Sequence, residues 1–426
     1  MSSGGAFPAN GSREALNSAR RWRVLHACER ARDVLPLVEG QIAAGMRPYI
    51  VTPQGAGSAE MYLAGHAQDQ ARALSLLRSW QDVRNWRKSI LDCDPDACAD
   101  VVHAHSFAAG MAGVRSFGCV VYDLAACIEE LAISTRQAEA GSWMGRSFRV
   151  AEQFVLSRAS AVVVHSNLMK QAAVERSAPA GDVFVIPDPL PEAEEFASGF
   201  DTTDVLSGHF GFGPEIVAVY APELLPAESD EIPPATIAIL QSFSSAAAEI
   251  PELRMLTTAP ADLRGKLLEL AGSLGISGRL VLAEPAHRGA LMQSAHVVIA
   301  SGEPPKDPVV AREPNYTALE ALQNGTALLA ADVPRNREAS PNGQGCLWFD
   351  PHHARDLAAR LTFLARHADF RHELGASGRH FIIETRSGTA IGKKYAEVYR
   401  HAVSRRRTTG LGPGMVSLQP ATNWGA

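Results

Sequence analysis

The hydrophobic residues of this chain fall into short continuous runs, separated by segments in which apolar residues recur every three or four positions. A short continuous run is typical of a strand buried on both faces, and the wider spacing is typical of a helix with one buried face. Strands alternating with helices favour a parallel, doubly wound sheet. In the first part of the chain we expect strands at 24–27, 48–52, 100–105, 119–122, 161–166 and 183–187, and helices at 33–44 and 148–158.

The pattern is interrupted at residues 188–213, which are rich in Pro, Glu, Gly and Ser and are typical of a linker. It then resumes in the same form. Because 426 residues exceed what one hydrophobic core usually organises, the interruption predicts two α/β domains in series. In the second domain we expect strands at 216–220, 253–257, 280–282, 297–300, 327–330 and 346–349, and helices at 235–249, 261–274, 316–324 and 354–367.

Composition argues against several classes of protein. No apolar stretch reaches the roughly 20 residues of a membrane-spanning helix, and the polar N-terminus lacks the apolar core of a signal peptide, so we expect a cytoplasmic protein. The six cysteines form no Cys-x-x-Cys pair, which favours reduced thiols, and no metal or cofactor is expected. The net charge is −6 and the basic excess is weak and diffuse, which argues against nucleic-acid binding.

The charge is unevenly distributed along the chain. Residues 177–253 contain no Lys or Arg but 14 Asp or Glu. Four of these carboxylates lie close together in the stretch 223–231. A loop of this charge repels any anionic group beside it. A phosphate bound near this loop would therefore need cations from another part of the chain.

Several segments resemble those of glycosyltransferase family 4, which has the GT-B fold. Residues 314–332 (PNYTALEALQNGTALLAAD) are similar to the family's helix whose glutamate meets the donor nucleotide. Six such segments follow one another in the family's order and span residues 23–403. They are 100–107, 152–166, 185–189, 314–332, 345–361 and 381–403.

The resemblance implies two Rossmann-like domains facing across a cleft, with doubly wound parallel sheets. It also implies a terminal helix that crosses back to the first domain. The resulting prediction is an acceptor-side domain at 21–187, a linker at 188–213, a donor-side domain at 214–385, the terminal helix at 386–403, and a disordered tail at 404–426.

The family transfers a sugar from a nucleotide-sugar with retention at the anomeric carbon. The resemblance therefore implies a nucleotide-sugar donor and, as acceptor, a saccharide or a lipid-linked molecule. The segment 143–149 could contact a membrane, which would place the protein at the inner membrane face. The alternative is that these residues begin a core-facing helix with two solvated arginines.

The donor site is expected at the start of the helix near Asn315. Free backbone N–H groups and the helix dipole would face a diphosphate there, and Glu320, one turn later, would accept hydrogen bonds from ribose. The alternative is that Glu320 only caps or solvates its helix. The expected donor-binding residues are Ser301, Gly302, Arg312, Asn315, Tyr316, Thr317 and Glu320, and the expected acceptor-side residues are His105 and Arg30.

The family motif has two glutamates with seven residues between them, and the first faces the donor sugar. Counting back from Glu320 places Arg312 at that position. Either the motif is lost, or a shift of one residue makes Glu313 the catalytic carboxylate.

The family also supplies an Arg and a Lys from the loop after the first strand of the second domain. Here that loop is the acidic stretch 223–231. The donor site is therefore predicted to be degenerate, with Arg312, Lys306 or Arg288 as replacement cations. The competing hypothesis is a pseudo-glycosyltransferase that binds or regulates a partner glycosyltransferase.

Arg312 offers a specific prediction. If it replaces the missing cations, its guanidinium should lie within hydrogen-bonding reach of the helix that begins near Asn315. The alternative is that Arg312 points to solvent or pairs with Glu303 or Asp307 in its own loop.

Overall fold

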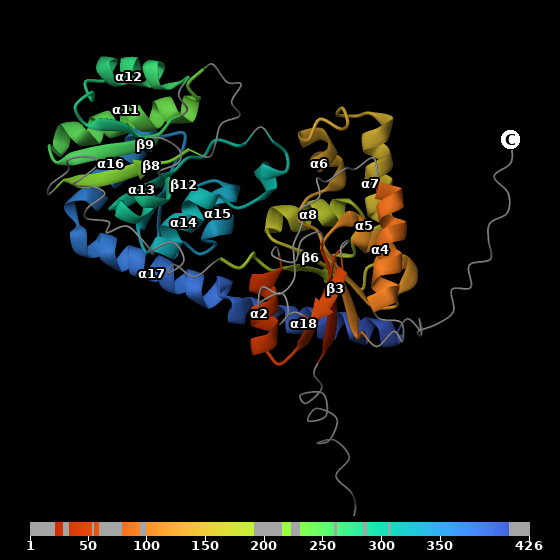
Figure 1. Ribbon diagram of the computed structural model, residues 1–426. Helices are drawn as coiled ribbons and strands as arrows, with labels where there is room; N and C mark the ends of the chain where they lie inside the picture. The colour runs from red at the N-terminus through yellow and green to blue at the C-terminus, as the bar shows by residue number, and fades with distance from the viewer. Residues whose placement is uncertain are drawn as a thin grey trace, which may run out of the picture.

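The computed structural model describes residues 22–28, 34–52, 55–58, 79–93, 99–190, 215–222, 231–259, 262–283, 288–305 and 307–408. Within these ranges the chain forms two α/β domains, and two consecutive C-terminal helices run beneath both of them (Figure 1). Most of the predicted linker and of the predicted tail lies outside the described residues.

The first domain is built on a sheet of order β3-β2-β1-β4-β5-β6-β7. All neighbouring strands pair in parallel except β2 and β3, which are antiparallel. The strands are β1 (Arg23–Ala27), β2 (Arg47–Thr52), β3 (Gly55–Ser58), β4 (Val101–Ala104), β5 (Val120–Asp123), β6 (Ala161–Val164) and β7 (Val183–Val185). Its helices are α2 (Leu35–Ala43), α4 (Ser79–Cys93), α5 (Phe107–Ser116), α6 (Ile128–Ser134), α7 (Trp143–Leu156) and α8 (Asn167–Glu175).

The second domain has a fully parallel sheet of order β10-β9-β8-β11-β12-β13. The strands are β8 (Ile216–Tyr220), β9 (Leu253–Thr258), β10 (Leu280–Ala283), β11 (Val297–Ala300), β12 (Ala327–Ala331) and β13 (Cys346–Phe349). The helices are α11 (Pro234–Glu249), α12 (Arg264–Ser273), α13 (Arg288–Ser294), α14 (Tyr316–Asn324), α15 (Pro334–Ala339) and α16 (Ala354–Arg366), and they are followed by α17 (Ala368–Arg386) and α18 (Gly388–Thr408). Both predicted sheets are confirmed.

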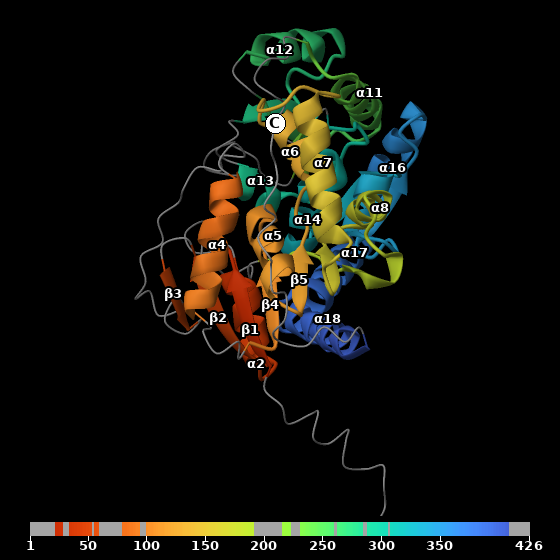
Figure 2. The ribbon, with the colours of Figure 1, turned by 90° about the vertical axis from the view of Figure 1, so that its right-hand side faces the viewer.

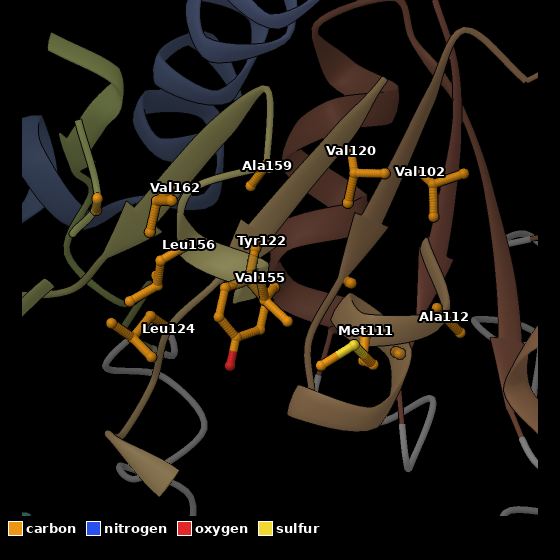
Figure 3. Packing of buried hydrophobic residues seen from close by; sticks show 14 of the residues in the cluster. Val102, Met111, Ala112, Val120, Tyr122, Leu124, Val155, Leu156, Ala159 and Val162 are labelled. Carbon is orange, nitrogen blue, oxygen red and sulfur yellow. The ribbon is translucent and has the colours of Figure 1, made fainter. Parts of the chain in front are cut away.

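Alternate residues of the first sheet serve two different cores, because successive side chains of a strand point to opposite faces. On one face, Val120, Tyr122 and Val162 pack against Met111 of α5 and Leu156 of α7 (Figure 3). The opposite face carries Val24, Val101, Val121, Ala161 and Val163, and α18 covers it. The C-terminal helix is thus part of the core of the first domain.

Helix α18 approaches the first domain at glycines. A Cβ atom placed on Gly40 of α2 would overlap the carbonyl of Gly388, and one placed on Gly392 would overlap the carbonyl of Gly40. Only glycine allows two helix backbones to come this close. The view turned by 90° shows α2 and α18 together at the foot of the first domain (Figure 2).

The predicted tail begins too early. Helix α18 continues to Thr408, beyond the expected end at residue 403. The last turns of α18 are attached to the first domain by ion pairs, because His401 and Arg405 both pair with Asp182. The acid that anchors this end lies more than 200 residues away in the sequence, so the helix end could not be seen locally.

Candidate functional site

The carboxyl ends of the two sheets meet between the domains. Ser166, the N-cap of α8, donates its hydroxyl to the carbonyl of Arg312, in the segment after β11 (2.6 Å). Ser134 of α6 donates to Asp307, and the backbone N–H of Leu168 donates to Glu338 of α15. Ligand sites of open parallel sheets lie at this edge, so the polar residues of both edges are the candidate site.

Helix α14 begins and ends where the sequence predicts. Asn315 is its N-cap, and Gly325, with φ of 72°, ends it in the left-handed conformation. The backbone N–H groups of its first turn are less available than expected, however. The Oδ1 atom of buried Asn315 accepts from Thr317 N (3.0 Å) and Ala318 N (3.4 Å). A good N-cap side chain therefore occupies donors that were expected to face a diphosphate.

Arg288, the first residue of α13, lies against the first turns of α14. Its Nε and Nη2 atoms donate to Oε2 of Glu320 at 3.0 and 2.9 Å. Nη2 also donates to the hydroxyl of Thr317 (2.7 Å), and Nη1 donates to the carbonyl of Ala221, directly after β8 (3.1 Å). Glu320 thus neither caps its helix nor is merely solvated, because it pairs with a cation from another helix.

The arrangement leaves part of Glu320 available. Its side chain is 40% exposed. Among the described residues, its second oxygen, Oε1, has no hydrogen-bond partner. The cluster therefore places an accepting carboxylate oxygen beside a guanidinium whose nitrogens already bond Glu320, Thr317 and the carbonyl of Ala221.

The other expected donor-side residues lie around the same edge. Ser301 lies near the hydroxyl of buried Tyr220 of β8, which hydrogen-bonds to Thr236 of α11 (3.0 Å). Gly302 is closely packed, since an added Cβ would lie 3.0 Å from that of Ala331. Tyr316 is 42% exposed at the start of α14.

Arg312 does not lie where either prediction placed it. Its Nε and Nη2 atoms donate to Oε2 and Oε1 of Glu130, both at 2.8 Å. Glu130 belongs to α6 of the first domain, so Arg312 joins the two domains rather than supporting the start of α14. Sequence reasoning missed this pair because its members are 182 residues apart. Glu313 follows Arg312, and its carbonyl accepts from Arg335 (2.9 Å).

The Arg312 pair belongs to a buried ionic chain in the first domain. Glu130 also accepts from Arg176 (2.7 Å), whose Nε lies 3.7 Å from Glu152. Burial alone would raise the pKa of Glu130, but the two arginines lower it. Burial raises the pKa of Glu152 to about 7, although the Ile128 N–H and Arg176 oppose this rise. Among these ionic residues, Glu152 is thus the carboxylate whose negative charge is least well balanced by its neighbours.

On the first domain, three polar residues follow or end adjacent strands. Asp123 ends β5, and His165, after β6, donates to it from Nε2 (2.8 Å). His105, after β4, places Nδ1 3.3 Å from the other carboxylate oxygen of Asp123. Burial would lower the pKa of His165, but Asp123 and Asp188 raise it to about 10. Asp123 and His165 therefore form a buried ion pair.

Two further histidines lie behind His105, on the face that α18 covers. The Nδ1 atom of His26 is 2.9 Å from Nε2 of His105, and His26 Nε2 is 2.8 Å from the amide oxygen of Gln41. The Gln41 amide donates to the hydroxyl of Tyr399, which is 2.9 Å from Nδ1 of His103. Both ring nitrogens of His105 are thus already occupied within the protein.

Some expected residues lie outside the described residues, namely Arg30, Lys306 and positions 223–230 of the acidic loop. Of the two replacement cations that the structure describes, Arg288 lies at α14 and Arg312 lies at Glu130. The sequence indicated Arg288 only as a source of charge, and its pairing with Glu320 was not expected. Asp123, His165 and Glu130 were not recognised as site residues, although the first two are polar residues at the carboxyl ends of predicted strands.

Residues 29–189 match the family model described as a glycosyl transferase 4-like domain. This match covers the first domain. A search of curated proteins found no match to the chain. None of the described helices is both long and apolar enough to cross a membrane.

Solved structures that are similar over most of the chain extend the comparison to the second domain. A glycosyltransferase from Rickettsia africae is 12% identical, with a TM-score of 0.61 over 90% of this chain and 99% of that one. Anabaena HepE in complex with UDP-glucose is 15% identical, with a TM-score of 0.55 over 89% and 99% of the two chains. The predicted GT-B fold is confirmed. The predicted glycosyltransferase class rests on the family match over the first domain.

Proposed function

We propose that this protein is a retaining glycosyltransferase that moves a sugar from a nucleotide-sugar to a saccharide or lipid-linked acceptor. The glycosyl transferase 4-like domain supports the class of reaction. The similarity to HepE, a protein solved with UDP-glucose, supports a uridine diphosphate sugar as the first donor to test.

The observation that carries the proposal is the cluster of Arg288, Thr317 and Glu320 at the start of α14. A nucleoside diphosphate needs a hydrogen-bond acceptor for its ribose hydroxyls and a cation for its phosphates. Oε1 of Glu320 supplies the first. Arg288 supplies the cation for the phosphates. It reaches the carbonyl of Ala221 at the end of β8. The segment that contains β8, residues 177–253, has no Lys or Arg of its own. The donor pocket is therefore modified, with its cation on α13.

Glu313 is the carboxylate that we assign to the donor sugar. Arg312, at the motif position, is bound to Glu130 by its side chain and to Ser166 by its carbonyl. These contacts fix the segment beside the first domain, and Glu313 is its next residue. The acceptor would approach from the first domain, on the side of His105.

A second candidate is a catalytically impaired pseudo-glycosyltransferase that binds or regulates a partner glycosyltransferase. It is favoured by the capped N–H groups of α14 and by the commitment of Arg312 to Glu130. Oxyanion stabilisation is often the largest contribution to catalysis, so the loss of these donors at a departing diphosphate would favour binding without turnover.

Turnover and binding distinguish the two. The full chain is incubated with a panel of nucleotide-sugars, UDP-glucose first, and donor hydrolysis and UDP binding are measured. We expect UDP to bind, and Glu320→Ala to weaken binding about tenfold or more by removing a charged hydrogen-bond acceptor. Glu384→Ala, which removes an exposed carboxylate on α17, is the matched control and should bind like the natural protein. Binding without hydrolysis would favour the second candidate, and no binding by any nucleotide would refute both donor assignments.

A further inference from the structure

The outer face of helix α7 carries the most exposed large hydrophobic side chains among the described residues. Trp143 is 73% exposed and Val150 is 65% exposed. Their spacing places both on one face of the helix, opposite the buried Glu152 and Leu156. Residues 143–149 therefore begin a helix, but Trp143 points away from the core. The outer face of α7 is apolar along its centre and has no partner within the described part of the chain.

The exposed charges of α7 are all positive. Arg146 and Arg149 are exposed on the helix, and Arg158 is exposed just after its end. The single carboxylate in the sequence of α7, Glu152, is fully buried. Arg149 also lies 3.8 Å from Glu129 of α6, but the Glu129 side chain is only 13% exposed. The outer face of α7 thus combines an apolar centre with a basic border.

Helix α4 presents a second basic face on the same side of the first domain. Its exposed side chains include a set at helical spacing, namely Arg84, Arg87, Lys88 and Leu91. The acidic residue described as exposed on α4 is Asp92, near its end. The buried faces of α4 and α7 belong to one core cluster, so their outer faces point away from the same side of the sheet. Figure 2 shows both helices on the side of the first domain that is turned to the viewer.

We propose that the outer faces of α7 and α4 bind the surface of an anionic lipid bilayer. The partner must offer negative charge to the basic side chains and an apolar layer to Trp143 and Val150. An anionic bilayer offers both, because its charged headgroups cover an apolar interior. A nucleic acid offers the charge without the apolar layer. The net charge of the chain is −6, so the attraction is local and orients this face toward the membrane.

The length of α7 defines how it contacts the bilayer. Its 14 residues span roughly 21 Å at about 1.5 Å per residue, which is less than the roughly 30 Å of a hydrocarbon core. The helix therefore lies along the surface, with Trp143 and Val150 entering the headgroup region and the arginines at the level of the phosphates. Tryptophan is enriched at this depth because its ring is apolar and its N–H is polar.

The start of α7 lies beside the interface between the two domains. Phe148 of α7 packs against Ile128 and Ala132 of α6. Ser134, at the end of α6, donates to Asp307 of the second domain. A bilayer along α7 would therefore hold a lipid-linked molecule near the edge where the acceptor enters. This favours a lipid-linked acceptor over a soluble saccharide, a step that rests on the proposed function.

The test measures co-sedimentation of the full chain with vesicles. One set contains equal parts of phosphatidylcholine and phosphatidylglycerol, and the other contains phosphatidylcholine alone. We expect binding to the anionic set that weakens as salt is added, and much weaker binding to the neutral set. An arginine near an anionic surface contributes about fivefold in affinity, so Arg146→Gln/Arg149→Gln should weaken binding about 25-fold. Trp143→Ala should weaken it about tenfold by removing apolar contact area.

Two control variants change the same kinds of side chain on the second domain. Arg355→Gln/Arg379→Gln removes two exposed arginines, and Ile383→Ala removes an apolar side chain that is 55% exposed. Both should bind the anionic vesicles like the natural protein, and circular dichroism checks that every variant is folded.

Three results would overturn the proposal. They are equal or absent binding of the natural protein to the two sets of vesicles, an equal loss in the control variants, and unchanged binding of Trp143→Ala, which would indicate a partner that needs only negative charge. Vesicle binding does not depend on the donor site. Normal vesicle binding without UDP binding or donor hydrolysis would therefore count against the proposed function and leave the membrane contact standing.

Discussion

The two edges that meet between the domains use similar polar residues in opposite ways. On the first domain, His105, Asp123 and His165 bond to one another and to residues behind them, and each is mostly buried. On the second domain, Arg288 and Glu320 also form a pair, but 40% of the Glu320 side chain is exposed and its Oε1 has no partner among the described residues.

The difference follows from what lies behind each sheet edge. Helix α18 covers the back of the first sheet, and the buried polar groups there must satisfy one another because water cannot reach them. No such burial constrains the outer side of Glu320. A buried, fully bonded cluster positions and stabilises, whereas a pair with an accessible oxygen can receive a ligand. On this basis we propose that the donor binds on the second domain.

The largest expected effect comes from separating α18 from the first edge. Gly40→Ala places a Cβ where the carbonyl of Gly388 lies, so α18 must move. We expect the free energy of unfolding to fall by about 3 kcal/mol, measured by urea denaturation. Gly265→Ala, in α12 with open space around it, is the control and should be neutral or slightly stabilising. Equal stability of the two variants would show that the glycine contact is not needed.

A smaller effect concerns pH and Glu152. The folded pKa of about 7 is above the ordinary value of 4.5, so its stabilising contribution is complete below pH 4.5 and is lost as pH rises through 7. Glu152→Gln keeps the acceptor for Ile128 N–H and cannot ionise. Relative to the natural protein, its free energy of unfolding should rise by about 2 kcal/mol between pH 5 and pH 8. The difference is measured by denaturation at both pH values, and a pH-independent difference would contradict the assignment.

The smallest expected effect concerns the contact between the two edges. Arg312→Ala leaves Glu130 paired with Arg176, so we expect only about 1 kcal/mol of lost stability. It removes a charged contact between the domains, however, and the radius of gyration in small-angle scattering should increase. Arg337→Ala, which removes a surface pair with Asp332, should leave the radius unchanged. An unchanged radius in Arg312→Ala would mean that other contacts hold the domains together.

Features set by neighbouring residues were predictable from the sequence, and those set by distant ones were not. Helix α14 begins after Asn315 and ends at Gly325 as expected, because a helix cap depends on residues within a few positions of the helix end. Strand β3 (Gly55–Ser58) was missed because its small residues carry no hydrophobic pattern. Helix α7 begins at Trp143, after the N-cap Ser142, and not at residue 148. This start agrees with the alternative interpretation of residues 143–149 as the beginning of a helix.

The site residues divide in the same way. The segment 314–332 was enough to single out Thr317 and Glu320 as candidate site residues. Their binding of the donor nucleotide remains a prediction. Their partner Arg288 is about 30 residues away and meets them only because α13 and α14 start at the same edge of the sheet. The pairing of Arg312 with Glu130 depends on how two domains meet, which no local pattern encodes.

The central claim is that Arg288 supplies the cation that the donor site otherwise lacks. The most direct measurement is calorimetric binding of UDP and of uridine to Arg288→Ala. As a matched control, Arg264→Ala removes an arginine at the start of α12 that donates to the carbonyl of Leu282. A guanidinium that binds phosphate contributes about 1.5–3 kcal/mol, so UDP affinity should fall by about tenfold or more in Arg288→Ala. Uridine affinity should stay the same in both variants, and UDP affinity should stay the same in Arg264→Ala. Unchanged UDP affinity in Arg288→Ala, or an equal loss for uridine, would contradict the account.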